Sequence, residues 1–218
     1  MTGTTEVDRP APLFFLSYAR TGRSSSHITE HELDRQVGTF FDDLSDNVSG
    51  LVARRPGADP GFMDTSIPSG THWTRELLQA LGACRVFIPL LCGPYISSEW
   101  CGMEWYAFSQ RMVSFGSEFA HQTPIIPVIW APYPRNLTPQ AVQAIQHFSP
   151  DGMPNVDVVG EYEKYGVSGL MWLRLDNSYR GVVWRLAQRI ADFHHNYEVE
   201  SSTFRKEELL NIFEEPSP

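Results

Sequence analysis

The sequence lacks long apolar runs and has few basic residues, and each shortage excludes a class of protein. No stretch approaches the roughly 18 apolar residues that a membrane-spanning helix needs. The chain has 17 lysines and arginines against 26 aspartates and glutamates, a formal net charge of −9, which argues against a broad nucleic-acid-binding face. Its first residues have no apolar core typical of a signal peptide. We therefore expect a soluble, cytoplasmic protein that binds neither membrane nor nucleic acid.

The sequence also lacks the patterns of disulfide frameworks, metal sites and phosphate-binding loops. It has three cysteines, an odd number, and their spacing matches no common zinc pattern. His27 and His31 enclose Glu30, but this is not the H-E-x-x-H zinc motif and no third ligand is evident. No glycine-rich loop of the P-loop or Rossmann type is present. We therefore predict reduced thiols and no metal site.

Short apolar runs alternate with amphipathic helices along the 218 residues. The expected strands are residues 13–16, 61–64, 85–91, 123–130 and 169–175. The expected helices are residues 33–52, 73–81, 99–113, 138–148 and 179–197. This alternation predicts an α/β domain over residues 13–197, with a five-stranded parallel sheet covered on both faces. Residues 1–12 are expected to be a flexible lead-in, and residues 198–218 a partly disordered tail.

Polar and aromatic residues follow three of the expected strands. The first strand is followed by Ser17, Tyr18 and Arg20, the second by Asp64, and the third by the segment 95–104. Ligands of open parallel sheets bind outside the carboxyl ends of the strands. We therefore expect a binding pocket where these three segments meet.

Three motifs in this region occur in order and with familiar spacing. They are LFFLSY at residues 13–18, Phe62-Met63-Asp64 followed by Ile67-x-x-Gly70-x-x-Trp73, and S-x-W-C-x-x-E at residues 98–104. Together they resemble the Toll/interleukin-1 receptor (TIR) domain family over roughly residues 12–197, and most of all TIR-like proteins of actinobacteria. The resemblance implies a flavodoxin-like three-layer fold. The segments before Phe62 and over residues 131–168 are longer than usual for the family.

The resemblance also implies an activity, because catalytically active TIR domains cleave the bond between nicotinamide and ribose in NAD⁺. It places Glu104 as the catalytic carboxylate. Nicotinamide leaves as a neutral pyridine, so one carboxylate that stabilises the oxocarbenium-like ribose is enough, whereas ordinary glycosidases need two. The products would be nicotinamide plus ADP-ribose or a cyclic isomer, with NAD⁺ as substrate and no cofactor. The alternative interpretation of Glu104 is a partly exposed helix residue beside a core tryptophan.

Five further residues are expected to line the nucleotide pocket: Ser17, Tyr18, Arg20, Asp64 and Trp100. Trp100 precedes Glu104 by one helical turn and so shares its face. Tyr18 either stacks on a base of the ligand or packs on the next loop. Arg20 either binds the pyrophosphate or is solvated, and Ser17 either lines the pocket or ends the strand. For Asp64 we favour fixing the following loop over binding the ribose hydroxyls.

The resemblance further implies self-association through the BB loop (Ile67, Gly70 and Trp73), which completes the pocket of the next protomer. It also implies a separate sensor or activator protein, in antiphage defence or another signalling process. Two alternative functions remain. One is a non-catalytic TIR adaptor, which has no need for the pair of Trp100 and Glu104. The other is a nucleoside deoxyribosyltransferase-like enzyme, against which the S-x-W-C-x-x-E segment argues.

Overall fold

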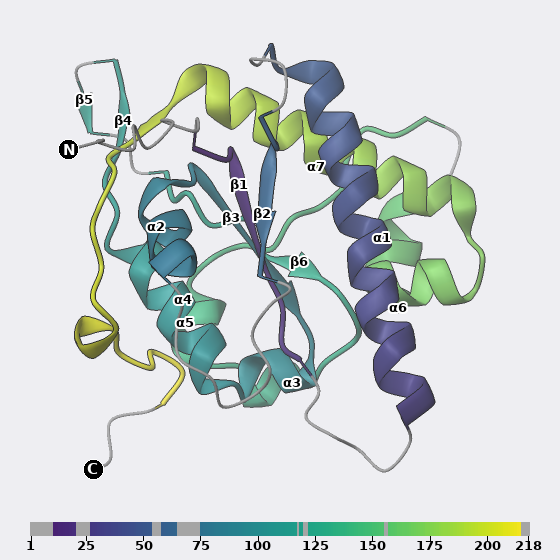
Figure 1. Ribbon diagram of the computed structural model, residues 1–218. Coiled ribbons are helices and arrows are strands. Elements are labelled where there is room, and N and C mark those ends of the chain that lie inside the picture. The colour runs from purple at the N-terminus through teal and green to yellow at the C-terminus, as the bar shows by residue number, and fades with distance from the viewer. Residues whose placement is uncertain are drawn as a thin grey trace, which may run out of the picture.

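The protein is described by a computed structural model that covers residues 11–20, 27–53, 58–64, 75–116, 118–119, 122–154 and 157–214. Within these residues a four-stranded sheet has the order β2-β1-β3-β6 and is parallel throughout. Its strands are β1 (Phe14–Ser17), β2 (Gly61–Met63), β3 (Val86–Leu91) and β6 (Val128–Ile129). This α/β arrangement confirms the predicted flavodoxin-like fold class (Figure 1).

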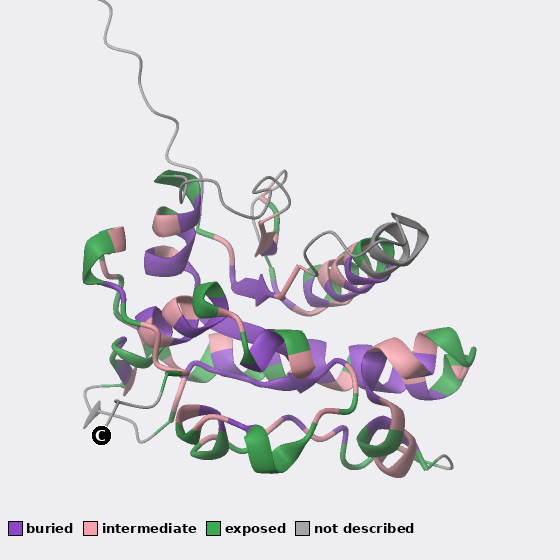
Figure 2. Cartoon of the chain, turned by 90° about the horizontal axis from the view of Figure 1, so that it is seen from below, coloured by how far each residue is buried: buried purple, intermediate pink, exposed green. Residues whose placement is uncertain are grey.

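Helices cover both faces of the sheet. One face carries α1 (His27–Leu51), α6 (Val158–Trp172) and α7 (Asp176–Asn196). The other side of the molecule carries α2 (Arg75–Ala83), α3 (Gly93–Ile96), α4 (Glu99–Ser109) and α5 (Gln140–Gln143). In Figure 2 the buried residues lie on the sides of the helices that face the interior. None of the helices within the described residues is long and apolar enough for a membrane crossing.

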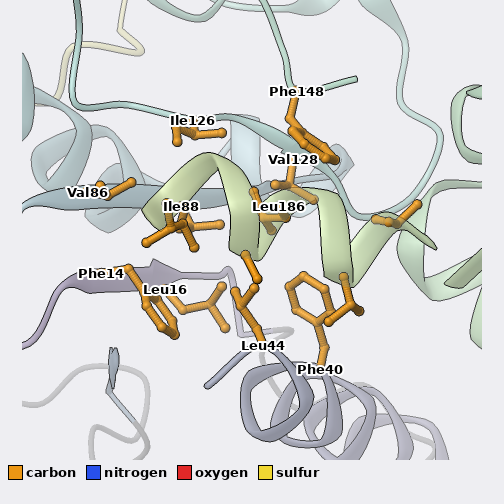
Figure 3. Close-up of a cluster of buried hydrophobic side chains, with 14 of the residues drawn as sticks. Phe14, Leu16, Phe40, Leu44, Val86, Ile88, Ile126, Val128, Phe148 and Leu186 are labelled. Carbon is orange, nitrogen blue, oxygen red and sulfur yellow. The ribbon is translucent and has the colours of Figure 1, made fainter. Parts of the chain in front are cut away.

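Strand residues alternate between two apolar cores, as the pleat of a β-strand requires. In β1, Phe14 and Leu16 belong to the core under α1 and α7, whereas Phe15 belongs to the core under α2 and α4. In β3, Ile88 belongs to the core under α1 and α7, and Phe87 belongs to the core under α2 and α4. Figure 3 shows the first of these cores, with side chains from the sheet meeting those of α1 and α7. A strand with both faces buried carries a continuous apolar run, which is why the sequence predicts β1 and β3 well.

The expected fifth strand, residues 169–175, is wrong: this segment forms the end of α6 and the start of the turn into α7. Its apolar residues do not share a strand face, because Leu170 is buried whereas Trp172 and Leu173 are exposed. The helix bends at Gly166, which has a φ of 65°. A Cβ atom there would lie 2.6 Å from the carbonyl oxygen of Trp130. Glycine therefore allows α6 to approach the end of β6.

Three other expected elements are shorter than predicted. Of the helix expected at 138–148 only α5 is present, and a 3₁₀ turn (Arg135–Leu137) precedes it. Of the strand expected at 123–130 only β6 is present. Residues 111–113 do not continue α4. Instead, a separate antiparallel sheet contains β4 (Val113–Phe115), β5 (Glu118–Phe119) and β7 (Glu198–Val199).

Residues 198–214, here named the C-terminal strap, run from β7 along α2 and α4 (Figure 1). They include a 3₁₀ turn, Lys206–Glu208, and the buried Leu209. Arg111 is only 5% exposed. It donates hydrogen bonds to the carbonyl oxygen of Glu200 in the strap, to that of Leu81 in α2 and to that of Cys84 just after α2. The segment expected to be a tail thus has defined contacts with the domain up to Phe213, whose ring contacts those of Tyr95 and Trp105.

Candidate active site

A pocket opens at the carboxyl ends of β1 and β2, beside α4. Its volume is about 700 Å³ with its open mouth included. It is lined by Phe15, Leu16, Ser17, Tyr18, Ala19, Arg20, Asp64, Leu77, Ser98, Trp100, Cys101 and Glu104. The six residues proposed from the sequence for catalysis and substrate binding are all in this set.

Helix α4 carries Trp100 and Glu104 into the pocket. Its N-cap is Ser98, whose side-chain oxygen accepts a hydrogen bond from the backbone N–H of Cys101 at 3.4 Å. The opposite side of α4 is anchored in the core by Trp105, which is 1% exposed. Because Trp100 and Glu104 lie one turn apart on a helix fixed at its start and along its buried side, both face the same pocket.

The carboxylate of Glu104 is held by a chain of two hydroxyl groups. The Ser17 hydroxyl donates a hydrogen bond to Oε2 of Glu104. The Ser17 oxygen also lies 2.9 Å from the hydroxyl of Tyr95. Ser17 is 2% exposed and Tyr95 is fully buried. Ser17 thus does more than end strand β1, because it links the first strand to the glutamate on α4.

Burial raises the pKa of Glu104 to about 7. The hydrogen bond from Ser17 opposes this effect, the charge of Asp64 adds to it, and the charge of Arg20 lowers the pKa again. Glu104 keeps partial solvent contact at the pocket, yet removal of the carboxylate from bulk water is the largest influence. The group therefore titrates close to neutral pH, where small changes in its surroundings change its charge.

Arg20 connects the ends of β1 and β2. Its Nε donates to the hydroxyl of Tyr18 at 3.2 Å, and its Nη2 donates to the backbone oxygen of Asp64 at 2.6 Å. The guanidinium carbon lies 5.7 Å from the centre of the Tyr18 ring, within cation–π range. Burial is the main reason that the pKa of Tyr18 is raised. Arg20 and Tyr18 therefore form one wall of the pocket.

The C-terminal strap reaches the opposite wall. Nζ of Lys206 lies 4.8 Å from the centre of the Trp100 ring, so a cation covers part of that ring. Trp100 remains 36% exposed. The tryptophan thus sits at the mouth of the pocket, supported by a segment about a hundred residues later in the chain.

The family of the chain follows from a sequence comparison. The TIR domain family matches residues 48–157, half of the chain. The chain belongs to the TIR domain family. The matched range contains Asp64, Trp100 and Glu104, whereas Ser17 joins them only through the fold. No significant match to a curated protein was found.

The resemblance of the sequence to TIR domains predicts that a BB loop comes after β2. The residues proposed for that loop, Ile67, Gly70 and Trp73, follow β2 in the sequence and lie outside the described residues. The described pocket therefore comprises the β1 end, the β2 end and α4. The TIR family includes NAD⁺ hydrolases as well as adaptors, so membership of the family alone does not choose between them.

Sequence reasoning missed two contributors to the TIR pocket. Tyr95 holds Ser17, and its only sequence signal is its position just before the S-x-W-C-x-x-E segment. Lys206 contacts Trp100, and no sequence signal indicates this. Both contacts join parts of the chain that local periodicity cannot relate.

Proposed function

We propose that this TIR domain cleaves the nicotinamide–ribose bond of NAD⁺, with Glu104 as the catalytic carboxylate. One observation carries the proposal: the carboxylate of Glu104 lines a pocket at the carboxyl ends of the strands and is held there by Ser17. An adaptor that acts only by self-association has no need for a buried glutamate oriented in this way. Burying a carboxylate is costly, and a catalytic role explains why the cost is tolerated.

The chemistry requires one anionic group near the ribose. The bond between ribose C1′ and the pyridinium nitrogen breaks, and its electron pair stays with that nitrogen, so nicotinamide leaves neutral. Positive charge develops on the ribose, and the Glu104 carboxylate stabilises it in a site with little water. Water then attacks C1′ and loses a proton to give ADP-ribose. Attack by a ring nitrogen of the adenine would instead give a cyclic isomer.

The remaining pocket residues have roles in binding the dinucleotide. The exposed face of Trp100 and the ring of Tyr18 provide stacking surfaces for its heteroaromatic rings. Arg20 provides a guanidinium for the pyrophosphate. Asp64 fixes the entry to the BB loop through the hydrogen bond that its backbone oxygen accepts from Arg20.

We also propose that the active form is an oligomer. The BB loop, with Ile67, Gly70 and Trp73, would complete the pocket of a neighbouring protomer, as the resemblance to the family implies. A separate sensor or activator protein would trigger the assembly in a defence or signalling process. Asp64 lines the described pocket and directly precedes the segment with these residues in the sequence, so the proposed loop would start at the pocket.

The first experiment measures nicotinamide release from NAD⁺ by chromatography for the wild type, Glu104→Gln and Glu99→Gln. Glu99 is a matched control because it is an exposed glutamate on the same helix and does not line the pocket. We expect Glu104→Gln to lose roughly 100-fold or more in rate, as when a major electrostatic stabiliser is removed, and Glu99→Gln to stay near the wild type.

The outcomes separate the three candidate functions. Equal release by Glu104→Gln and the wild type would contradict the catalytic assignment. Absence of release by the wild type at high protein concentration would favour the adaptor. Cleavage of deoxynucleosides without cleavage of NAD⁺ would favour the transferase-like enzyme. The co-product distinguishes a hydrolase from a cyclase.

A further inference from the structure

Tyr95 has a buried hydroxyl group that points toward the candidate catalytic residue. The side chain is fully buried. Its ring lies between the pocket and the C-terminal strap, with the ring of Phe213 at 6.0 Å. A buried tyrosine hydroxyl needs a hydrogen-bond partner. The partner is Ser17, at 2.9 Å, which in turn contacts Glu104.

The direction of the hydrogen bonds from Tyr95 through Ser17 to Glu104 follows from the carboxylate acceptor at their end. An ionised carboxylate only accepts hydrogen bonds, so the single proton of the Ser17 hydroxyl goes to Glu104. The Ser17 oxygen is then an acceptor, and the Tyr95 hydroxyl donates to it. Burial keeps the pKa of Tyr95 well above its ordinary value, so this hydroxyl stays protonated and serves as a permanent donor.

We propose that Tyr95 is a positioning residue, which acts through Ser17 to orient the carboxylate of Glu104 and stabilise its ionised form. Without the Tyr95 hydroxyl, the Ser17 oxygen loses the hydrogen bond from Tyr95 and keeps only the thiol of Cys101 beside it. The Ser17 hydroxyl is then less restrained from rotating away from Glu104. Hydrogen bonds in a chain also strengthen one another in a low-dielectric site. The catalytic consequence rests on the proposed function, whereas the effect on the charge of Glu104 does not.

The titratable and charged groups that face Glu104 come from several elements. They are Arg20 after β1, Asp64 after β2, Tyr95 of α3 and Cys101 of α4 itself. Among these, only Arg20 and Asp64 are charged near neutral pH, because burial raises the pKa of Cys101 and Tyr95. Removal of the Tyr95 hydroxyl alters neither charge, so any change in the titration of Glu104 reports on the hydroxyl chain.

The test compares Tyr95→Phe with Tyr162→Phe. Tyr162 is a matched control because it is also fully buried and its hydroxyl accepts a hydrogen bond, from the backbone N–H of Ile129 at 2.8 Å. It belongs to the core on the other face of the sheet and does not line the pocket. Both variants keep the ring, so the loss of packing is small. Ser17→Ala, alone and combined with Tyr95→Phe, completes a double-mutant cycle.

The primary readout is the titration of Glu104 by carboxyl ¹³C NMR, with the resonance assigned by its loss in Glu104→Gln. We expect Tyr95→Phe to move the titration midpoint upward by roughly 0.3 to 1 pH unit, the equivalent of one net hydrogen bond. Tyr162→Phe should leave it in place. In the Ser17→Ala background, Tyr95→Phe should have no further effect. An unchanged midpoint in Tyr95→Phe, or an equal shift with and without Ser17, would overturn the proposal.

Kinetics with NAD⁺ then test the catalytic consequence. We expect Tyr95→Phe to lower kcat roughly two- to tenfold at neutral pH with little change in KM, because the hydroxyl does not line the pocket. A change confined to KM would contradict a positioning role. If the wild type does not cleave NAD⁺, the proposed function fails, but the NMR titration still decides whether Tyr95 controls Glu104.

Discussion

A carboxylate that stabilises positive charge has to be ionised, yet Glu104 lies where burial favours its protonated form and raises its pKa to about 7. The Ser17 hydroxyl and the charge of Arg20 oppose this effect without cancelling it. Bound NAD⁺ would lower the pKa of Glu104, because its nicotinamide ring carries a positive charge and a nearby cation favours the ionised carboxylate. In the proposed reaction the substrate thus helps to ionise the carboxylate that stabilises the positive charge on its ribose.

Because NAD⁺ binding would favour ionisation of Glu104, kcat/KM and kcat should decrease at different pH values on the acidic side of their pH profiles. Each such decrease is here called an acid limb. The limb of kcat/KM reports the free enzyme and should lie near pH 7, whereas the limb of kcat reports the complex and should lie lower. Activity falls as the pH decreases through each limb, because only the ionised form is active. Steady-state rates between pH 5 and 9 measure both. A kcat/KM limb near the pKa of a free glutamate would show that Glu104 is not desolvated in solution.

At the scale of elements, sequence reasoning succeeded where one periodicity dominates and failed where context decides. Buried runs predicted β1 and β3, and the steps of three and four residues predicted α1 and α7. The run at 169–175 was assigned to a strand, but it ends α6 because Gly166 bends that helix toward Trp130. A short apolar run fits a strand and a helix equally well, so only the packing of its neighbours decides.

The bend predicts opposite effects of the same substitution at two glycines. Gly166→Ala should reduce the free energy of unfolding by about 1–3 kcal/mol, because its backbone conformation is restricted to glycine and the added methyl group would meet Trp130. Gly38→Ala in α1, where no atom lies near the added Cβ, should instead increase it by about 0.5–1 kcal/mol. Urea denaturation of both variants measures this. Similar effects at both positions would contradict the explanation by the backbone conformation of Gly166 and its contact with Trp130.

At the scale of the whole molecule, residues of the sheet and of the C-terminal strap together support the pocket. The strap contacts Trp100 through Lys206 and packs Phe213 against Trp105 and Tyr95. One wall of the pocket is thus supported by residues from the end of the chain. On the opposite side the pocket is lined by Asp64, and in our proposal the BB loop that comes after Asp64 in the sequence reaches a neighbouring protomer. Such a head-to-tail contact joins different surfaces and extends into rings or filaments.

If the pocket is completed between protomers, activity per molecule should rise with protein concentration. We expect this rise in the wild type and its loss in Ile67→Asp, because a buried charge disfavours an apolar contact. Leu210→Asp is the control, since Leu210 is 60% exposed on the strap and outside the proposed contact. Nicotinamide release over a dilution series, together with light scattering, measures both properties. Constant specific activity at all concentrations would mean that a single protomer holds the complete site.

The sequence by itself determined the parallel α/β architecture, because buried strands and amphipathic helices follow from local periodicity. It also determined that Trp100 and Glu104 share a helix face and that Ser17 and Asp64 end at the same sheet edge. Only the tertiary structure decided that the hydroxyl of Tyr95 meets Ser17, 78 residues away, and that Lys206 covers Trp100. Periodicity relates residues within one element, whereas these contacts depend on how distant elements pack.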